Sequence, residues 1–62
     1  MTIQQAIKSK KLFKRPFHLE WMKIPANNRI EYLVVVNNKR EALRGYTLSI
    51  EDILADDWEI QK

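Results

Sequence analysis

The stretch S-I-E-D-I-L-A-D-D-W-E-I, from Ser49 to Ile60, holds the start of a helix, its end and a strand-like segment. Ser49 is a suitable N-cap, because its hydroxyl can accept from the free backbone N–H groups of the next turn. Asp52, three residues later, can reach back as in a capping box. Glu51 and Asp52 also lie at the positive end of the helix dipole, where carboxylates are favoured. The sequence therefore predicts a helix that begins directly after Ser49.

This predicted helix is short and has one apolar face. Ile50, Ile53 and Leu54 follow the i, i+3, i+4 spacing. The pair Asp56-Asp57 ends the helix, and residues 58–60 alternate like a strand. Trp58 is interpreted as the main core residue of this strand or, alternatively, as the wall of a pocket in which Asp56 or Asp57 accepts from ligand hydroxyls. A helix of this length persists only when tertiary packing holds it, so we expect this end of the chain to be structured.

The N-terminal segment predicts a second short helix, from Thr2 to about Lys10. Thr2 caps it, and Gln5 completes a capping box. Residues 12–15 follow as a short extended piece, which Pro16 closes because proline moves the preceding residue out of helical geometry.

The middle of the chain predicts strands separated by turns. Residues 19–24, 30–36 and 42–48 are the candidate strands, and 30–36 is β-branched and aromatic throughout. Residues 25–28 and 37–39 are turns, the second because Asn tolerates the left-handed conformation. Gly45 indicates a bulge or a close backbone approach. We therefore predict one α+β domain, residues 1–62, with a small and strongly bent antiparallel sheet and a short helical turn before the last strand.

Length and composition limit the kinds of site. A domain of 62 residues has a thin core, and small domains often gain stability by self-association, so we expect a homo-oligomer, a dimer or a tetramer. The chain has no cysteine and only one histidine, His18, so neither a metal nor a cofactor is expected. No apolar run approaches the ~20 residues of a membrane span, which predicts a cytoplasmic protein.

Charge is distributed unevenly along the chain. Residues 1–15 carry five cations and no acid, and residues 48–60 carry five acids and no base. One interpretation is that the basic end binds phosphate or another anion. The other is that the two ends attract each other, within or between chains. The sequence leaves both open.

Signatures of catalysis are missing. One glycine cannot form a phosphate-binding loop, and there is no cysteine nucleophile or histidine with a spaced partner. Asp56 and Asp57 are adjacent, so on an extended chain their carboxylates point in opposite directions. We therefore expect no catalytic residues and no enzymatic activity.

The segment Lys14-Arg15-Pro16-Phe17-His18, followed by Trp21, is the candidate ligand-binding segment. A basic pair beside an aromatic ring, on a chain stiffened by proline, can bind an anionic aromatic ligand. In the alternative interpretation Phe17 and Trp21 are core or interface residues, and the cations are solvated.

Residues 52–58, D-I-L-A-D-D-W, resemble the D-(I/M)-L-A-x-D-W ending of a family of small phage proteins that includes the second type of Thoeris anti-defence protein. An anti-CRISPR protein has a similar sequence. Residues 3–7 are similar to the family's opening helix, x-F-x-x-A-L-x-x-x-K. Residues 13–18 lie where the family has A-R-(K/R)-G-W-N, and 22–24 follow at matching distance. Here Pro16-Phe17-His18 replaces Gly-Trp-Asn, and the middle of the chain is shorter.

This resemblance implies a non-catalytic, homo-oligomeric sponge in the host cytoplasm. Such a protein would bind a cyclic nucleotide-type immune signal, a cyclised ADP-ribose or a cyclic oligonucleotide, without cleaving it. The resemblance implies that Lys14 and Arg15 hold phosphate, that Phe17 or Trp21 stacks on the base, and that Asp56 or Asp57 accepts from ribose hydroxyls. His18 completes the set, listed in full as Lys14, Arg15, Phe17, His18, Trp21, Asp56 and Asp57.

Two other functions fit the sequence. The first is a protein-binding inhibitor of a host defence enzyme or complex, for which the divided charge offers a docking field. The second is nucleic-acid binding through residues 8–15, which the acidic C-terminal third disfavours.

Overall fold

The computed structural model describes residues 1–29 and 31–62, which form two short helices and five short strands. In chain order these are α1 (Ile3–Lys8), β1 (Phe13–Lys14), β2 (Met22–Lys23), β3 (Leu33–Val36), β4 (Ala42–Tyr46), α2 (Ile50–Leu54) and β5 (Glu59–Ile60). The predicted α+β class and the predicted order of elements are confirmed. Within the described part of the chain, neither helix has the length and apolarity needed to cross a membrane.

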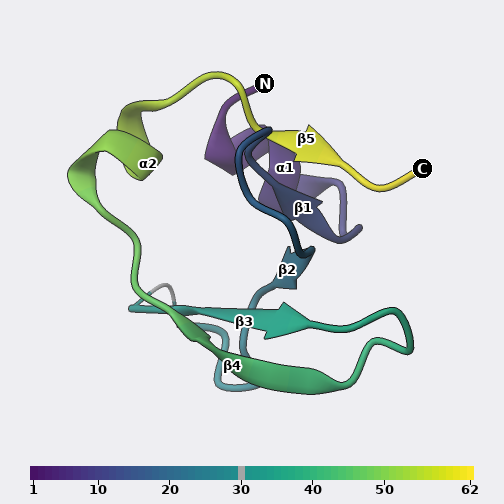
Figure 1. The fold of residues 1–62 in the computed structure, drawn as a ribbon. Helices are drawn as coiled ribbons and strands as arrows, with labels where there is room; N and C mark the ends of the chain where they lie inside the picture. The colour runs from purple at the N-terminus through teal and green to yellow at the C-terminus, as the bar shows by residue number, and fades with distance from the viewer. Residues whose placement is uncertain (30) are drawn as a thin grey trace.

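The strands form one antiparallel sheet in the order β4-β3-β2-β1-β5. β1 to β4 follow one another as a meander, and β5 returns to pair with β1, Phe13 opposite Ile60. The sheet is open, with β4 and β5 at its edges. β1 and β5 run at a clear angle to β3 and β4, so the sheet changes direction across β2 (Figure 1). This topology brings the acidic C-terminal segment beside the basic N-terminal one.

α1 begins at the predicted cap. The Gln5 N–H donates to the Thr2 hydroxyl (3.3 Å), and the Thr2 N–H donates to the Gln5 side chain (2.8 Å), which completes the capping box. The helix ends at Lys8, two residues before the predicted end, because Lys10 has φ 60° and so leaves the right-handed helix. Ile3 and Ala6 form its buried face.

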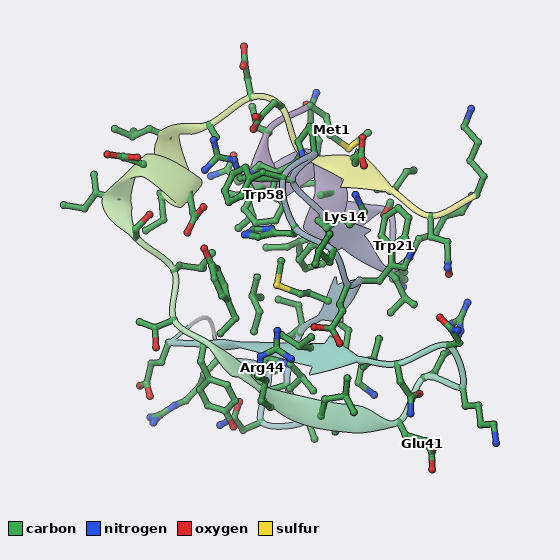
Figure 2. The ribbon with its side chains drawn as sticks, in the orientation of Figure 1. Met1, Lys14, Trp21, Glu41, Arg44 and Trp58 are labelled. Atoms are coloured by element: carbon green, nitrogen blue, oxygen red, sulfur yellow. The ribbon has the colours of Figure 1, made fainter. Side chains whose placement is uncertain are left out.

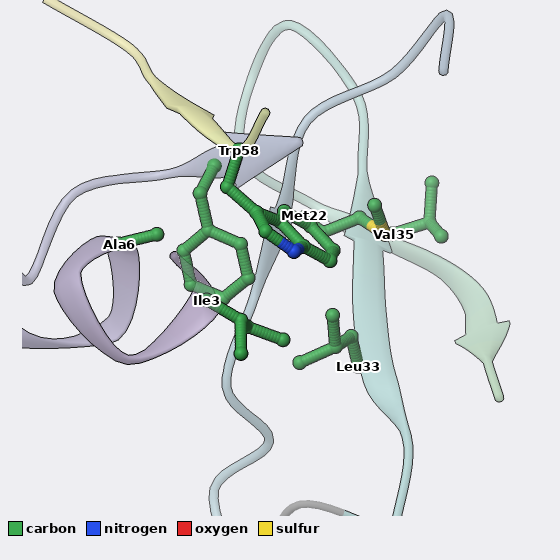
Figure 3. Packing of buried hydrophobic residues seen from close by; sticks show 7 residues of the cluster. Ile3, Ala6, Met22, Leu33, Val35 and Trp58 are labelled. Atoms are coloured by element: carbon green, nitrogen blue, oxygen red, sulfur yellow. The ribbon is translucent and has the colours of Figure 1, made fainter. Parts of the chain in front are cut away.

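The core gathers side chains from α1, from the middle of the sheet and from the C-terminal segment (Figure 3). Trp58 is 2% exposed, which confirms its predicted place in the core. Its ring meets Phe13 edge to face, with centroids 5.8 Å apart. The Trp58 N–H donates to the carbonyl of Met1 (2.9 Å), so the C-terminal segment is also tied to the start of α1.

β3 and β4 differ from the prediction in detail. β3 begins at Leu33, and the predicted first residue of this strand, Ile30, lies outside the described residues. The bulge falls between Val35 and Val36 rather than at Gly45. Gly45 is instead a close approach, since a Cβ there would lie 3.3 Å from the Tyr32 ring.

The hairpin turn between β3 and β4 also differs from the prediction. Its left-handed residue is Arg40, with φ 63°, and not an asparagine. Asn37 acts through its side chain, which accepts from the N–H groups of Lys39 and Glu41. Asn37 therefore stabilises the turn by the side-chain-to-backbone bonding typical of this residue.

α2 has the predicted cap but not a covered apolar face. The Asp52 N–H donates to the Ser49 hydroxyl (3.1 Å), and the Asp52 carboxylate accepts from the Ser49 N–H (3.0 Å). Ile50, Ile53 and Leu54 are exposed, whereas Asp52 is 1% exposed. The helix is therefore held through a buried carboxylate, and its apolar side is open to solvent. In Figure 1, α2 lies at one side of the molecule.

Candidate functional site

Arg15, directly after β1, is bound by two carboxylates of the C-terminal segment. Its Nη1 lies 2.8 Å from Asp52 Oδ1, and its Nε lies 2.8 Å from Asp57 Oδ1. The hydrogen bonds to Asp57 and Asp52 raise the pKa of Arg15, and the bond from Arg15 lowers the pKa of Asp57. Arg15 and Asp57 are two of the predicted ligand-binding residues, and the structure brings them together as an ion pair.

Asp52 is the centre of this network, and sequence reasoning assigned it only a capping role. Its carboxylate accepts from Arg15, from the Tyr46 hydroxyl (2.7 Å) and from Ser49. Burial by itself favours the protonated acid, but the hydrogen bonds from Ser49, Tyr46 and Arg15 outweigh it and lower the pKa of Asp52 to about 2. Burial and the bond to Asp52 raise the pKa of Tyr46 to about 12. The Asp52 carbonyl also accepts from the Trp58 indole (2.8 Å).

Lys14 makes a similar pair across the β1–β5 ladder. Its Nζ lies 2.8 Å from Glu59 Oε1, and the two residues are register partners. The same Nζ lies 5.1 Å from the centroid of the Trp21 ring, and the two labelled side chains are neighbours in Figure 2. Lys14 and Arg15 are therefore paired with the acidic end of the same chain. This geometry agrees with the interpretation in which the two ends of the chain attract each other.

Phe17 and His18 follow Pro16 in a tight turn, in which the His18 N–H donates to the Arg15 carbonyl (3.0 Å). Proline at the second position of such a turn fixes the required φ. The Phe17 ring lies 4.7 Å from the Arg15 guanidinium carbon and 4.3 Å from the His18 ring centroid. It is nevertheless 62% exposed, so Phe17 is not a core residue.

The surroundings of His18 favour its neutral form. Burial lowers the pKa of His18, and its Nδ1 accepts from the Arg15 N–H (3.3 Å), which places the proton on Nε2. That nitrogen is buried and has no hydrogen-bond partner among the side chains and backbone of residues 1–29 and 31–62. An unpaired buried donor costs about 1–3 kcal/mol.

Two surface hollows flank the segment from Phe17 to Trp21. The first, here called the Phe17 hollow, has a volume of about 200 Å³ and is lined by Phe17, His18, Leu19, Glu20, Met22, Val35, Arg44 and Tyr46. Arg44 and Glu20 join across it, Nη2 to Oε1, at 2.7 Å. The second, here called the Trp21 hollow, has a volume of about 320 Å³ and lies against Trp21, Val36 and Asn37. Leu19 and Glu20 line both.

Asp56 lies apart from these hollows. It is exposed, and its backbone carbonyl accepts from the Met1 nitrogen (2.6 Å). Neither Asp56 nor Asp57 lines the Phe17 hollow or the Trp21 hollow. Tyr46 and the Arg44–Glu20 pair, by contrast, line the Phe17 hollow and carried no signal in the sequence, because β4 meets this segment only in the folded sheet.

The described residues include no cluster of three or more His, Cys, Asp and Glu side chains that would hold a metal ion. Comparison of the chain with protein-family models, with curated proteins and with solved structures gave no match.

Proposed function

We propose that this protein is a phage anti-defence protein that binds and sequesters a cyclic nucleotide-type immune signal without cleaving it. The ligand would be a cyclised ADP-ribose or a cyclic oligonucleotide. This proposal rests on the resemblance of residues 52–58 to the small phage family and on one structural observation, the exposed Phe17 ring at the Phe17 hollow.

Phe17 supports the proposal because it is a stacking surface held in place. Arg15 packs on the ring at 4.7 Å and His18 at 4.3 Å, yet 62% of the residue stays exposed. An exposed aromatic ring binds a base at about 1–3 kcal/mol per stacked base. Trp21, at the second hollow, offers a further ring on the same segment.

In this proposal the phosphate is bound by exchange of partners. The Asp57 side chain is 45% exposed, whereas that of Asp52 is 2% exposed. A ligand phosphate therefore displaces Asp57 from Arg15 and leaves the Asp52 bond in place. Lys14 exchanges Glu59 for phosphate in the same way. Of the two candidates Asp56 and Asp57, the released Asp57 is the one that accepts from ribose hydroxyls, because Asp56 lies apart from the hollows.

The size of the Phe17 hollow supports a binding site that is completed by a second subunit of an oligomer. At about 200 Å³ it is smaller than the ~300–1,000 Å³ typical of ligand sites, so it holds one part of a nucleotide signal rather than all of it. A second subunit would supply the remaining wall, which accords with the expected dimer or tetramer.

Native mass spectrometry tests the proposal. The protein is incubated with an extract that contains activated immune nucleotide signals, and we expect a defined oligomer carrying a phosphate-containing adduct that heat releases intact. Phe17→Ala should abolish the adduct and keep the oligomer. Leu43→Ala, a change at another exposed apolar residue that does not line the hollow, should retain both. An oligomer that stays empty with cyclic dinucleotides, cyclic trinucleotides and cyclised ADP-ribose contradicts the proposal.

A second candidate is the protein-binding inhibitor of a host defence enzyme or complex, and the exposed face of α2 favours it. Ile50 and Leu54 are 75% and 78% exposed. Exposed apolar groups on one helix face are typical of a protein-docking surface. If this function is correct, Ile50→Ser/Leu54→Ser removes inhibition of the host target, and Phe17→Ala does not.

A further inference from the structure

A third hollow, here called the basic groove, lies between α1, the turn after β2 and the hairpin of β3 and β4. Its volume is about 420 Å³. Four cations line it: Lys10, Lys11, Lys23 and Arg40. It shares no lining residue with the Phe17 hollow. Met22 and Lys23 are neighbours on β2, and because successive strand residues point to opposite faces, they lie on opposite sides of the sheet.

The charges of the basic groove are not compensated as those of Lys14 and Arg15 are. No Asp or Glu is among its lining residues. Within the described residues, the salt bridges involve Lys14, Arg15, Arg29 and Arg44, and none involves the four groove cations. Arg40 has a neutral partner, the Gln61 side chain at 3.5 Å. A pocket with four cations and no acid has a positive potential that attracts anions.

The backbone around the basic groove is strained. Lys10, Asn28 and Arg40 have φ values of 60°, 60° and 63°, and they are the non-glycine residues with positive φ in the described chain. All three line the groove. The left-handed conformation is unfavourable for a residue with a Cβ, and Gly or Asn is the usual choice. At two of the three positions the chain carries a long cation instead, and this type of strain collects at binding sites.

We propose that the basic groove binds a small phosphate-bearing ligand, with its phosphates on Lys10, Lys11, Lys23 and Arg40. Ile7 and Ile24 add apolar surface, which suits a ligand that joins an anionic group to a flat or apolar one, as in a nucleoside diphosphate. The volume lies within the range of sites for ligands of that size. This site is separate from the Phe17 hollow and does not depend on the function proposed for it.

An NMR titration with ADP and with inorganic pyrophosphate tests the proposal on the full chain. We expect both probes to shift the backbone amide signals of Lys10, Lys11, Lys23 and Arg40 at physiological salt. The informative variant is Lys10→Gly/Arg40→Gly, because glycine accepts the left-handed backbone while the two charges are lost. Since a hydrogen bond to a charged group is worth about 1.5–3 kcal/mol, affinity for ADP should fall by about tenfold or more, and the melting temperature should not decrease.

Two control variants distinguish a specific binding site from nonspecific electrostatic attraction of anions. Lys8→Gln/Lys62→Gln has the same net charge as the glycine variant but changes residues outside the groove, so it should bind ADP as the parent chain does. Leu43→Ala, at an exposed residue that lines neither the basic groove nor the Phe17 hollow, should also leave ADP binding unchanged. Equal loss of affinity in both double variants, loss in Leu43→Ala, or no amide shifts with either probe would overturn the proposal. Tighter, salt-dependent binding of a short single-stranded RNA than of ADP would also overturn it, in favour of a nucleic-acid surface.

Discussion

At the scale of single residues, Asp52 links more parts of the molecule than any motif in the sequence suggests. Its carboxylate joins the end of β1 through Arg15 to the end of β4 through Tyr46, and its carbonyl accepts from the Trp58 indole. The carboxylate is also the N3 group of the α2 capping box. Because these hydrogen bonds are made to one buried group, removing that group weakens all of them at once.

Replacing Asp52 should therefore destabilise the fold strongly. In Asp52→Asn the Arg15 guanidinium keeps Asp57 but loses its buried carboxylate partner, and Tyr46 and Ser49 lose a charged acceptor, so the whole buried hydrogen-bond network is weakened. Urea unfolding should show a lower midpoint. Asp57→Asn is the matched control, because that side chain is 45% exposed and an exposed ion pair contributes little to stability. Equal losses in the two variants would show that Asp52 has no special role.

The same carboxylate makes the stability of the fold depend on pH in the acidic range. The pKa of Asp52 in the folded protein is about 2, lowered from 3.8, and the pKa of Asp57 is lowered as well. A lowered carboxyl pKa stabilises the fold above the unfolded-state pKa, and this contribution is lost as pH falls through the folded-state pKa. Thermal melts should thus show stability decreasing between about pH 4 and pH 2. Asp52→Asn should flatten that decrease, and an unchanged slope would contradict the assignment.

At the scale of elements, the local signals in the sequence predicted helix starts well and could not predict what covers a helix. Both capping boxes were predicted, because each depends on residues three positions apart. The spacing of Ile50, Ile53 and Leu54 predicted an apolar face, but periodicity carries no information on whether another element packs on it. The β3 bulge and the left-handed Arg40 were missed for a related reason, since both arise where two strands are fitted to each other.

The cap of α2 gives a test at this scale. Ser49→Ala removes the hydroxyl that accepts from the Asp52 N–H and donates to the Asp52 carboxylate, so the loss should be about 1–2 kcal/mol. Thr2→Ala, the matched change at α1, removes one longer bond of 3.3 Å and should cost less. Chemical denaturation of both variants measures the difference. A larger loss of stability for Thr2→Ala would contradict the claim that α2 is held through the buried Asp52 carboxylate.

At the scale of the whole molecule, opposite charges far apart in the sequence meet across the β1–β5 ladder and the Arg15 network. Lys14 and Glu59 are 45 residues apart, and Arg15 and Asp52 are 37 residues apart. The sequence left open whether the basic and acidic ends bind an anion or each other, because their pairing depends on β5 returning to β1. The structure pairs Lys14 and Arg15 with the acidic end, whereas the four cations of the basic groove have no acidic partner among the described residues.

A charge exchange tests this pairing. Glu59→Lys places two cations opposite each other on β1 and β5, and like charges at facing positions destabilise a sheet by up to about 1 kcal/mol. Lys14→Glu/Glu59→Lys restores the opposite charges and should recover most of the loss. A double-mutant cycle by thermal unfolding measures the coupling, and a coupling near zero would mean that the 2.8 Å contact contributes nothing.

The pairing of Phe13 with Ile60 also sets the order in which the chain can fold. β1 to β4 are joined by local connections and can assemble early, whereas β5 must close a long loop, which is slow. Until then β1 has an unpaired edge, and Phe13 lacks the Trp58 ring that covers it. An unpaired edge beside an uncovered aromatic ring promotes pairing between chains. Refolding should therefore compete with aggregation, and its yield should fall as protein concentration rises.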